Sequence, residues 1–343
     1  MHTYKSRFML LLNKYIIIVI FLIVMAVFGS LSVKFLSMQN LGSVMLTQAI
    51  AACLSLGAMF ILVSGEFDLS LGYNLNFCAV LCAFLAARGW GAVPVFFASV
   101  LMGTFAGLLN GLVVVKLKIS SFIVTLSIGL MLSGLSRAVT GGGILSVSEP
   151  KALMNFARGS IGPWGYCVIF FLVLALIVHL VFSHTPFGRH MYAVGISTKA
   201  SFMAGIKVDR IRILAFMCAG MFAGISGAIL LGQLGAASSA YGTSLLLPAY
   251  AVVFLSKTAI RPGYINIPGL LIATLLISFS KNGVQMIGVP NWGNHIFEGA
   301  VLIFAMWLST RFSVSGRLRS KKTQGKPRTG KGDGGVSNGV GSN

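Results

Sequence analysis

Charged side chains are scarce in this 343-residue chain. Asp, Glu, Lys and Arg together make up 9% of the residues, whereas soluble domains carry roughly 25%. Hydrophobic residues make up 56% of the chain, and its mean hydropathy is +0.90. This composition excludes a soluble globular domain. It predicts an all-α polytopic membrane protein, because an apolar helix satisfies all of its backbone hydrogen bonds within the bilayer.

Acidic residues are especially rare. Ion-coupled transporters generally place carboxylates, His or Lys inside their spans, and here Glu298 is the only acid that is a candidate for such a position. His179 and His184 would face about 140° apart on a continuous helix, and no third ligand accompanies them. We therefore predict neither ion coupling nor a metal site. The chain has six acids in all: Glu66, Asp68, Glu149, Asp209, Glu298 and Asp333.

Cysteine pairs and catalytic constellations are also missing. The five cysteines are scattered through apolar stretches without metal-ligand or disulfide spacing, so we interpret them as small buried hydrophobes. No Ser, Cys, His or Asp grouping fits a nucleophile with its base, which argues against an intramembrane enzyme. The apolar run after Lys14 reaches about Leu36 without a cleavage site, so it is expected to be a retained first helix.

Long apolar runs, by contrast, are abundant. A transmembrane helix needs roughly 20 apolar residues, or fewer if it is short or broken. We predict ten spans, near 15–36, 43–64, 71–87, 92–115, 121–140, 164–183, 213–234, 245–257, 266–288 and 294–311.

The positive charges predict the orientation. With a cytoplasmic N-terminus at 1–14, twenty of the 26 Lys and Arg residues fall on the cytoplasmic side and six on the other. This asymmetry matches the positive-inside rule. Orientation and anionic membrane lipids then account for the net charge of +20, and no nucleic-acid partner is needed. We assign 15–312 to the transmembrane permease domain.

The basic tail, 313–343, lacks an apolar period and is predicted to be a disordered cytoplasmic segment. Residues 325–332 resemble a phosphate-binding loop, but Gly332 stands where Ser or Thr should follow the Lys, and no flanking strand or helix is indicated. We therefore expect this chain to bind no cofactor and to have no ATPase activity of its own.

Two glycine patterns suggest how the spans pack. Glycines spaced by four residues open one helix face to a neighbouring backbone, which predicts that the fourth and seventh spans are interior. Asn110-Gly111 and Asn282-Gly283 are followed by apolar residues at matching offsets, in spans that cross in opposite directions. This match suggests two inverted halves around a translocation path. The glycines of the first pattern are Gly103, Gly107, Gly111, Gly220, Gly224 and Gly227.

Neutral polar residues inside the spans are candidates for lining that path. Amides and hydroxyls suit an uncharged polyhydroxylated solute, although each could equally form an interhelical hydrogen bond. Glu66 and Asp68 lie between the second and third spans, where gating and helix capping are alternative roles. The candidate path residues are Gln48, Asn74, Asn76, Asn110, Thr125 and Asn282.

The longest polar segment between spans covers 184–211. Within it we predict a short helix with Ser197 as N-cap and Gly205 as C-cap. Phe202 and Met203 are apolar residues on this segment, which should face water. They favour an anchor for a groove on a partner protein; the alternative is an amphipathic turn lying on the bilayer surface.

Together these motifs resemble the permease subunits of ribose-type ABC importers, a bacterial family that also includes autoinducer-2 importers. The resemblance covers roughly 45–310. It rests on the order and spacing of Gly65-Glu-Phe-Asp-Leu-Ser-Leu-Gly72, Asn110-Gly111, Leu117-Lys-Ile119, Phe122–Leu126, Phe187-Gly-Arg189, Tyr192–Gly195, Ala204-Gly-Ile206, Arg261-Pro-Gly263, Asn282-Gly283, Gly288 and Gly299.

The resemblance implies a ten-helix permease in the bacterial cytoplasmic (inner) membrane, with both termini cytoplasmic. Its implied partners are a cytoplasmic ATP-binding subunit that carries ATP-Mg, a periplasmic or lipid-anchored solute-binding protein, and a second permease copy or paralogue. The implied function is inward transport of a small neutral sugar or sugar-like solute by alternating access. A stand-alone secondary transporter or facilitator is the alternative. The residues implied to couple to the ATPase are Arg189, Gly195, Ser197, Lys199, Phe202, Met203 and Gly205.

The chain departs from the family pattern at three of these sites. Ser120 replaces a common Pro in the turn after the fourth span, where we count it as a gate candidate with Glu66 and Asp68. Ser197 replaces a common Asn, and Lys199 lies where small or acidic residues often occur. These departures bear on the substrate and on details of coupling, but they leave the class unchanged.

Overall fold

The computed structural model describes the backbone of residues 2–324, and side chains over 15–290 and 292–308. Two short antiparallel pairs join β1 (Ile144–Ser146) to β4 (Ala236–Ser238) and β2 (Ser160–Ile161) to β3 (Trp164–Gly165). The other elements are α1 (His2–Leu31), α2 (Met38–Val63), α3 (Leu71–Ala86), α4 (Ala92–Leu117), α5 (Ser121–Thr140), α6 (Lys151–Arg158), α7 (Tyr166–His184), α8 (Pro186–Ile196), α9 (Thr198–Met203), α10 (Val208–Leu234), the 3₁₀ turn η1 (Thr243–Leu245), α11 (Leu246–Ser256), α12 (Ile267–Met286) and α13 (Asn291–Gln324).

The ten predicted spans correspond to α1–α5, α7 and α10–α13, so the prediction of an all-α polytopic fold is confirmed. Six helices are long and apolar enough to cross a bilayer: α2, α4, α5, α7, α10 and α12. Shorter apolar helical stretches occur at Tyr15–Leu31, Leu71–Ala86 and Thr243–Ser256. The protein is therefore a multi-pass membrane protein.

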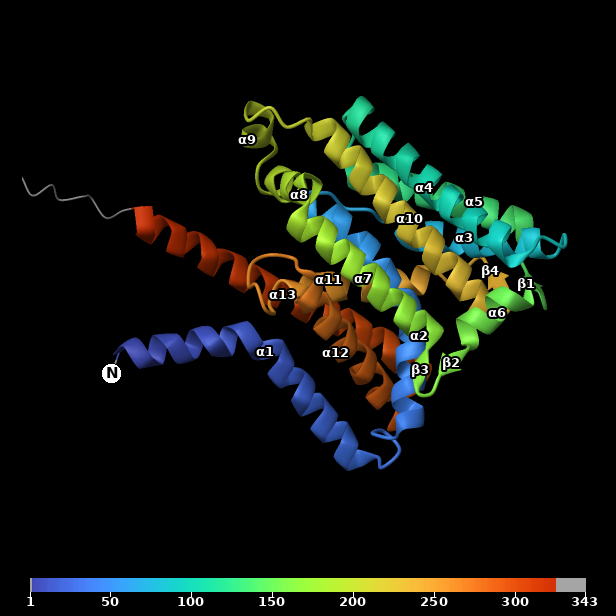
Figure 1. Cartoon of the computed structure of the whole chain (residues 1–343), viewed down its shortest axis with the longest axis horizontal. Coiled ribbons are helices and arrows are strands. Elements are labelled where there is room, and N and C mark those ends of the chain that lie inside the picture. The colour runs from blue at the N-terminus through green and yellow to red at the C-terminus, as the bar shows by residue number, and fades with distance from the viewer. Residues whose placement is uncertain (1, 325–343) are drawn as a thin grey trace, which may run out of the picture.

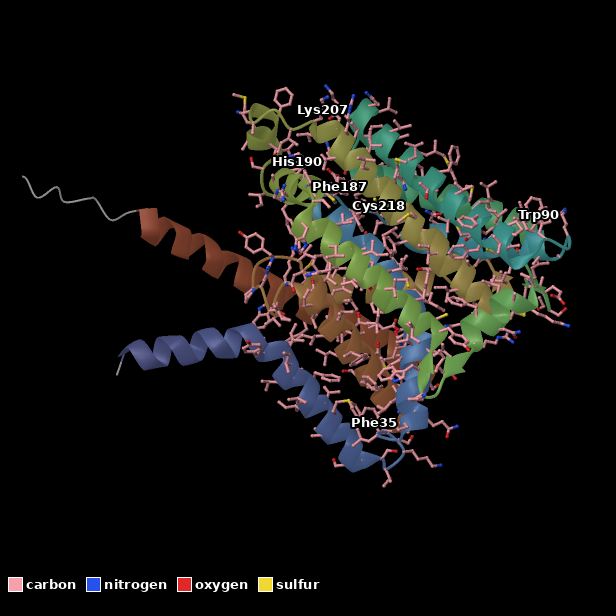
Figure 2. The ribbon with its side chains drawn as sticks, viewed as in Figure 1. Phe35, Trp90, Phe187, His190, Lys207 and Cys218 are labelled. Carbon is pink, nitrogen blue, oxygen red and sulfur yellow. The ribbon has the colours of Figure 1, made fainter. Side chains whose placement is uncertain are left out.

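The helices form an elongated bundle with two different ends. Figure 1 shows α8 and α9 at one end, and α6 with the four short strands at the other. In Figure 2, Phe187, His190 and Lys207 mark the first end, whereas Trp90 and Phe35 lie far from it. Trp90 is half-exposed in the turn before α4, a position typical of an aromatic side chain at a membrane interface.

The tightest helix pair is α4 with α10. The helix α10 is mostly buried, as predicted, whereas most of α4 outside this contact is exposed, so the prediction that α4 is an interior helix is wrong. A Cβ atom placed on Gly220 would collide with the backbone carbonyl of Gly103, and one placed on Gly107 would collide with the carbonyl of Phe216. The Ser99 hydroxyl also donates a 2.7 Å hydrogen bond across this contact to the carbonyl of Gly224. The glycine spacing therefore has the predicted effect: it lets two backbones touch.

The packing partners follow the pattern that two inverted halves would give. In the first half α3 packs on α4 and α5, and in the second α11 packs on α12 and α13. One helix of each half also packs against the other half: α10 packs on α3 and α4, and α2 packs on α11 and α12. The two Asn-Gly pairs differ in detail: Gly111 lies against Ile213 of α10, whereas Gly283 lies against Phe28 of α1.

The structure corrects one expectation about a segment outside the spans and adds one helix that was not predicted. The helix α13 continues to Gln324, so the tail is not disordered from residue 313 onward; Arg, Lys and Leu extend an existing helix without a new nucleation cost. Residues 325–343, with the loop-like glycine motif, lie outside the described residues. The sequence also did not reveal α6, which buries Leu153, Met154 and Ala157 on one face.

Candidate coupling surface and the turn beneath it

The predicted helix in the segment 184–211 is present as α9. Ser197 is its N-cap, and its hydroxyl accepts a hydrogen bond from the Ala200 amide at 3.2 Å. Gly205 follows the C-cap with a φ of +79°, which a residue with a side chain rarely adopts. The sequence did not reveal α8, the helix just before it, which Thr185 caps by accepting from the Gly188 amide.

Apolar side chains on α9 face outward. Phe202 is 71% exposed and Met203 is 79% exposed, whereas Ser201 beside them is buried. Arg189 and Lys199 are also exposed in the same segment. A two-residue apolar anchor on a capped helix, with cations nearby, is a surface suited to docking in a groove.

The helix α8 is joined to the bundle through Gly195. A Cβ atom there would collide with the carbonyl of Val63 at the end of α2, and the Cα of Gly195 lies 3.3 Å from the Cβ position of Gly65. This glycine-to-glycine contact places the outward-facing segment directly on the turn formed by residues 64–70. Any larger side chain at Gly195 would separate the two.

The turn 64–70 is clamped by a tyrosine of α11. The Tyr250 hydroxyl accepts from the Asp68 amide at 3.0 Å and donates to the Asp68 carbonyl at 2.7 Å. The Tyr250 ring stacks on Phe67 with centroids 4.6 Å apart. On the other side of the turn, Thr125 of α5 accepts from the Leu69 amide at 3.0 Å. The turn thus joins α11, α5 and α8.

The two acids of this turn have different partners. Glu66 forms an ion pair with Arg212 in the first turns of α10. Asp68 is buried and accepts from both the amide and the hydroxyl of Ser70, at 2.8 and 2.6 Å. Burial raises the pKa of Asp68 to about 6, and the hydrogen bonds from Ser70 oppose that rise. Glu66 therefore holds the turn to α10, whereas the Asp68 carboxylate stabilises the turn itself.

The capping interpretation of this turn needs one correction. The C-cap of α2 is Ser64, and Gly65, which was expected to be the C-cap, follows it with a φ of +84°. The N-cap position of α3, however, is Ser70 and not Asp68. The Asp68 carboxylate satisfies the Ser70 amide instead, because the chain makes one further turn before the helix begins. Ser120, the third gate candidate, is exposed at the N-cap position of α5 and forms no capping hydrogen bond.

Most candidate path residues are engaged in hydrogen bonds between segments. Asn74 donates to the Gly103 carbonyl at 3.1 Å, and Asn76 accepts from the Gly242 amide at 3.0 Å. Asn110 donates to the Ser70 hydroxyl at 2.7 Å and so extends the network of the turn. In the described structure Asn74, Asn76, Asn110 and Thr125 are buried among helices, and the structure does not place them together along one cavity.

Asn282 and Gln48 are placed differently. Asn282 forms a reciprocal amide pair with Asn40, at 2.9 and 3.3 Å. Gln48 lines a small cavity of about 20 Å³ beside Lys281 and Glu298, whose charged groups lie 2.6 Å apart. This ion pair between α12 and α13 was not predicted. The signal that could have revealed it is a base and an acid within two neighbouring predicted spans.

Replacing Tyr250 by Phe tests the clamp on the turn. The variant keeps the ring but leaves the buried amide and carbonyl of Asp68 without their partner, which should cost about 1–3 kcal/mol. We expect the melting temperature in detergent to fall by several degrees. Tyr264→Phe is the matched control, because this tyrosine is 55% exposed and its loss should change the melting temperature little. Equal melting temperatures for the two variants would contradict the assigned role of Tyr250.

The fold and this surface define a class: a multi-pass helical membrane protein with an exposed helical docking segment connected to an interior turn. The comparisons with known proteins agree. The chain belongs to the family described as branched-chain amino acid transport system / permease component, whose family model matches residues 40–306. It is thus a membrane-embedded permease component of a transport system.

Curated relatives cover most of the chain. The Ribose import permease protein RbsC of Bacillus subtilis (strain 168) is 30% identical over 297 residues, which is 85% of this chain and 91% of the relative. The protein of the same name from Escherichia coli (strain K12) is 27% identical over 84% of this chain and 91% of its own length. The Autoinducer 2 import system permease protein LsrC of Enterobacter sp. (strain 638) is 29% identical over 89% of this chain and 88% of its own length.

Proposed function

We propose that this chain is the transmembrane subunit of an ATP-binding-cassette importer that moves a small neutral sugar or sugar-like solute inward. The observation that carries this proposal is the exposed Phe202–Met203 pair on α9, on a segment that packs through Gly195 onto the turn 64–70. The ribose and autoinducer-2 import permeases among the relatives support the choice of substrate class.

The proposed assembly has four further components. A cytoplasmic ATP-binding subunit, which carries ATP-Mg, docks on α9. A second permease copy or paralogue completes the translocation path, and a periplasmic or lipid-anchored solute-binding protein delivers the solute to the opposite face. Membrane lipids surround the pair. The proposed location is the bacterial cytoplasmic membrane, with both termini in the cytoplasm, as the distribution of Lys and Arg favours.

The proposed mechanism is alternating access driven from α9. Closure of the ATPase dimer moves α9, and α8 moves with it because only Ser197 separates the two helices. The Gly195 contact passes this displacement to the turn 64–70. From there the Tyr250 clamp and the Thr125 hydrogen bond reach α11 and α5. Rigid contacts of this kind support the transmission of a rigid-body motion into the helices.

Uptake of labelled D-ribose into proteoliposomes tests the proposed function. The vesicles contain this chain with the ATP-binding subunit that copurifies with it, and the matching solute-binding protein. We expect uptake only when ATP is present on the ATPase side, and none with a non-hydrolysable ATP analogue. Equal uptake without ATP and without the ATP-binding subunit would instead identify a facilitator and contradict the proposal. A panel of uncharged sugars in the same assay identifies the substrate.

A further inference from the structure

A cleft of about 140 Å³, lined by both polar and apolar side chains, lies at the α8–α9 end of the bundle. One wall is the end of α7, with His179 and Ser183, and the opposite wall is the loop 257–266, with Arg261. A single water needs only about 10–15 Å³ of such space, so the cleft can hold a larger polar group. The proposed coupling surface and the turn 64–70 do not use these three residues.

The loop that carries Arg261 is held in a fixed shape. The Asn266 side-chain amide donates to the carbonyls of Ser256, Ala259 and Tyr264, at 2.9, 3.0 and 3.0 Å. The Tyr192 hydroxyl of α8 donates to the carbonyl of Ile265 at 2.5 Å. These bonds connect the loop to itself and to α8. The backbone that carries Arg261 is therefore held in place before any ligand arrives, which lowers the entropic cost of binding.

Ile260, the residue before Arg261, has a φ of +60°. A β-branched residue in this left-handed region is unusual and costs about 1–3 kcal/mol. The strained residue thus directly precedes Arg261, at the point where the backbone turns toward the cleft. Strained backbone of this kind is often found at ligand-binding positions.

The charge of the cleft is unbalanced. Among the residues that the structure describes, no carboxylate lines the cleft, and the Arg261 guanidinium has no ion pair. The described carboxylates that do form ion pairs are Glu66, Glu149 and Glu298, and none of them borders the cleft. The Arg261 guanidinium, the ring N–H of His179 and the hydroxyl of Ser183 offer hydrogen-bond donors to an anion.

We propose that this cleft binds the phosphate group of an anionic phospholipid. Arg261 presents the planar pair of N–H donors that matches phosphate oxygens, and His179 and Ser183 complete the donor set. A lipid is the favoured source because Leu172 and Leu176, which lie on the His179 face of α7 at i−7 and i−3, are exposed apolar residues along which acyl chains can lie. The end of the bundle that carries the cleft also carries the excess of Lys and Arg, where anionic headgroups gather.

Lipid titration of the purified full-length chain, followed by native mass spectrometry, tests the proposal. The probes are dioleoylphosphatidylglycerol and dioleoylglycerol, which lacks the phosphate. We expect retention of phosphatidylglycerol alone, with an affinity at least about tenfold weaker in Arg261→Gln, because charge-assisted hydrogen bonds are lost. The affinity of Arg261→Lys for phosphatidylglycerol should lie between those of the parent and of Arg261→Gln. The matched control is Lys116→Gln, which removes an exposed cation at the C-terminal end of α4 and should bind as the parent does.

The other outcomes would overturn the proposal. Unchanged binding by Arg261→Gln, or an equal loss in Lys116→Gln, would show that the lipid senses only the general positive charge. Equal retention of dioleoylglycerol would show that the apolar surface binds and the phosphate does not. Displacement of phosphatidylglycerol by millimolar inorganic phosphate would identify a site for the free anion instead of a lipid.

Discussion

Replacement of Gly220 by Ile is expected to abolish correct packing of the membrane domain. The side chain would have to occupy the position of the Gly103 carbonyl on α4, and the obstacle is backbone, which cannot rotate away. Overpacking a core typically costs up to about 3 kcal/mol, and a collision with backbone lies at or above that limit. The melting temperature in detergent should fall by roughly 6–12 °C or more, with loss of the monodisperse peak in size-exclusion chromatography.

Gly134→Ile provides the control for this experiment. Gly134 lies on α5, also within a membrane helix, but a Cβ atom there meets nothing within 4 Å. The same substitution at this exposed position should leave both the melting temperature and the elution profile close to those of the parent. If Gly134→Ile and Gly220→Ile behave alike, the damage comes from isoleucine in a helix and not from the α4–α10 contact.

Replacement of Phe202 and Met203 together by Asp is expected to release the ATP-binding subunit. Both side chains are exposed on α9, so the change should leave the fold intact. Within the proposed interface each Asp would put a charge where an apolar side chain was buried. Loss of an apolar anchor of this type often weakens binding by about 2 kcal/mol or more. The amount of ATP-binding subunit that copurifies with the tagged chain should drop by at least about tenfold, and ATP-driven uptake should stop.

Val33→Asp is the matched control, because it adds an acid to a residue that is 95% exposed in the connection between α1 and α2, away from α9. Its copurification should equal that of the parent. Retention of the ATP-binding subunit by the double variant would contradict the docking role of α9. In the alternative, α9 lies on the bilayer surface and does not contact the ATP-binding subunit. The double variant would then weaken the association of this segment with vesicles and leave the ATP-binding subunit bound.

The local features of the fold were predictable because they depend on residues close in sequence. A run of apolar residues predicts a helix whatever its neighbours are, so each of the ten predicted ranges coincides with a helix, including the short α11. The caps of α9 were predictable for the same reason: Ser197 and the amide it accepts from are three residues apart. The missed elements, α6 and α8, carry mixed polar and apolar residues, and their helical form depends on the bundle surface that they cover.

The roles of the polar residues were not predictable from the sequence. Neutral residues inside spans suit either a path or an interhelical bond, and only the positions of the partners distinguish these. Asn74, Asn76, Asn110 and Thr125 turned out to bond to other segments, so as a group they contribute to packing in the single chain. Lys281 and Glu298 are a further example. They form an ion pair in the structure, but the sequence alone did not indicate that they are partners.

The sequence by itself determined the class of fold, the positions of the main helices, the charge asymmetry and the exposed apolar pair on α9. Composition, hydrophobic run length and short-range capping control these features, and they need no long-range partner. Only the tertiary structure decided that the turn 64–70 is the point where α8, α11 and α5 meet. Its main clamp joins Asp68 to Tyr250, 182 residues apart in the chain. A contact over that distance exists because the helices between them pack in one particular arrangement, and no local pattern records it.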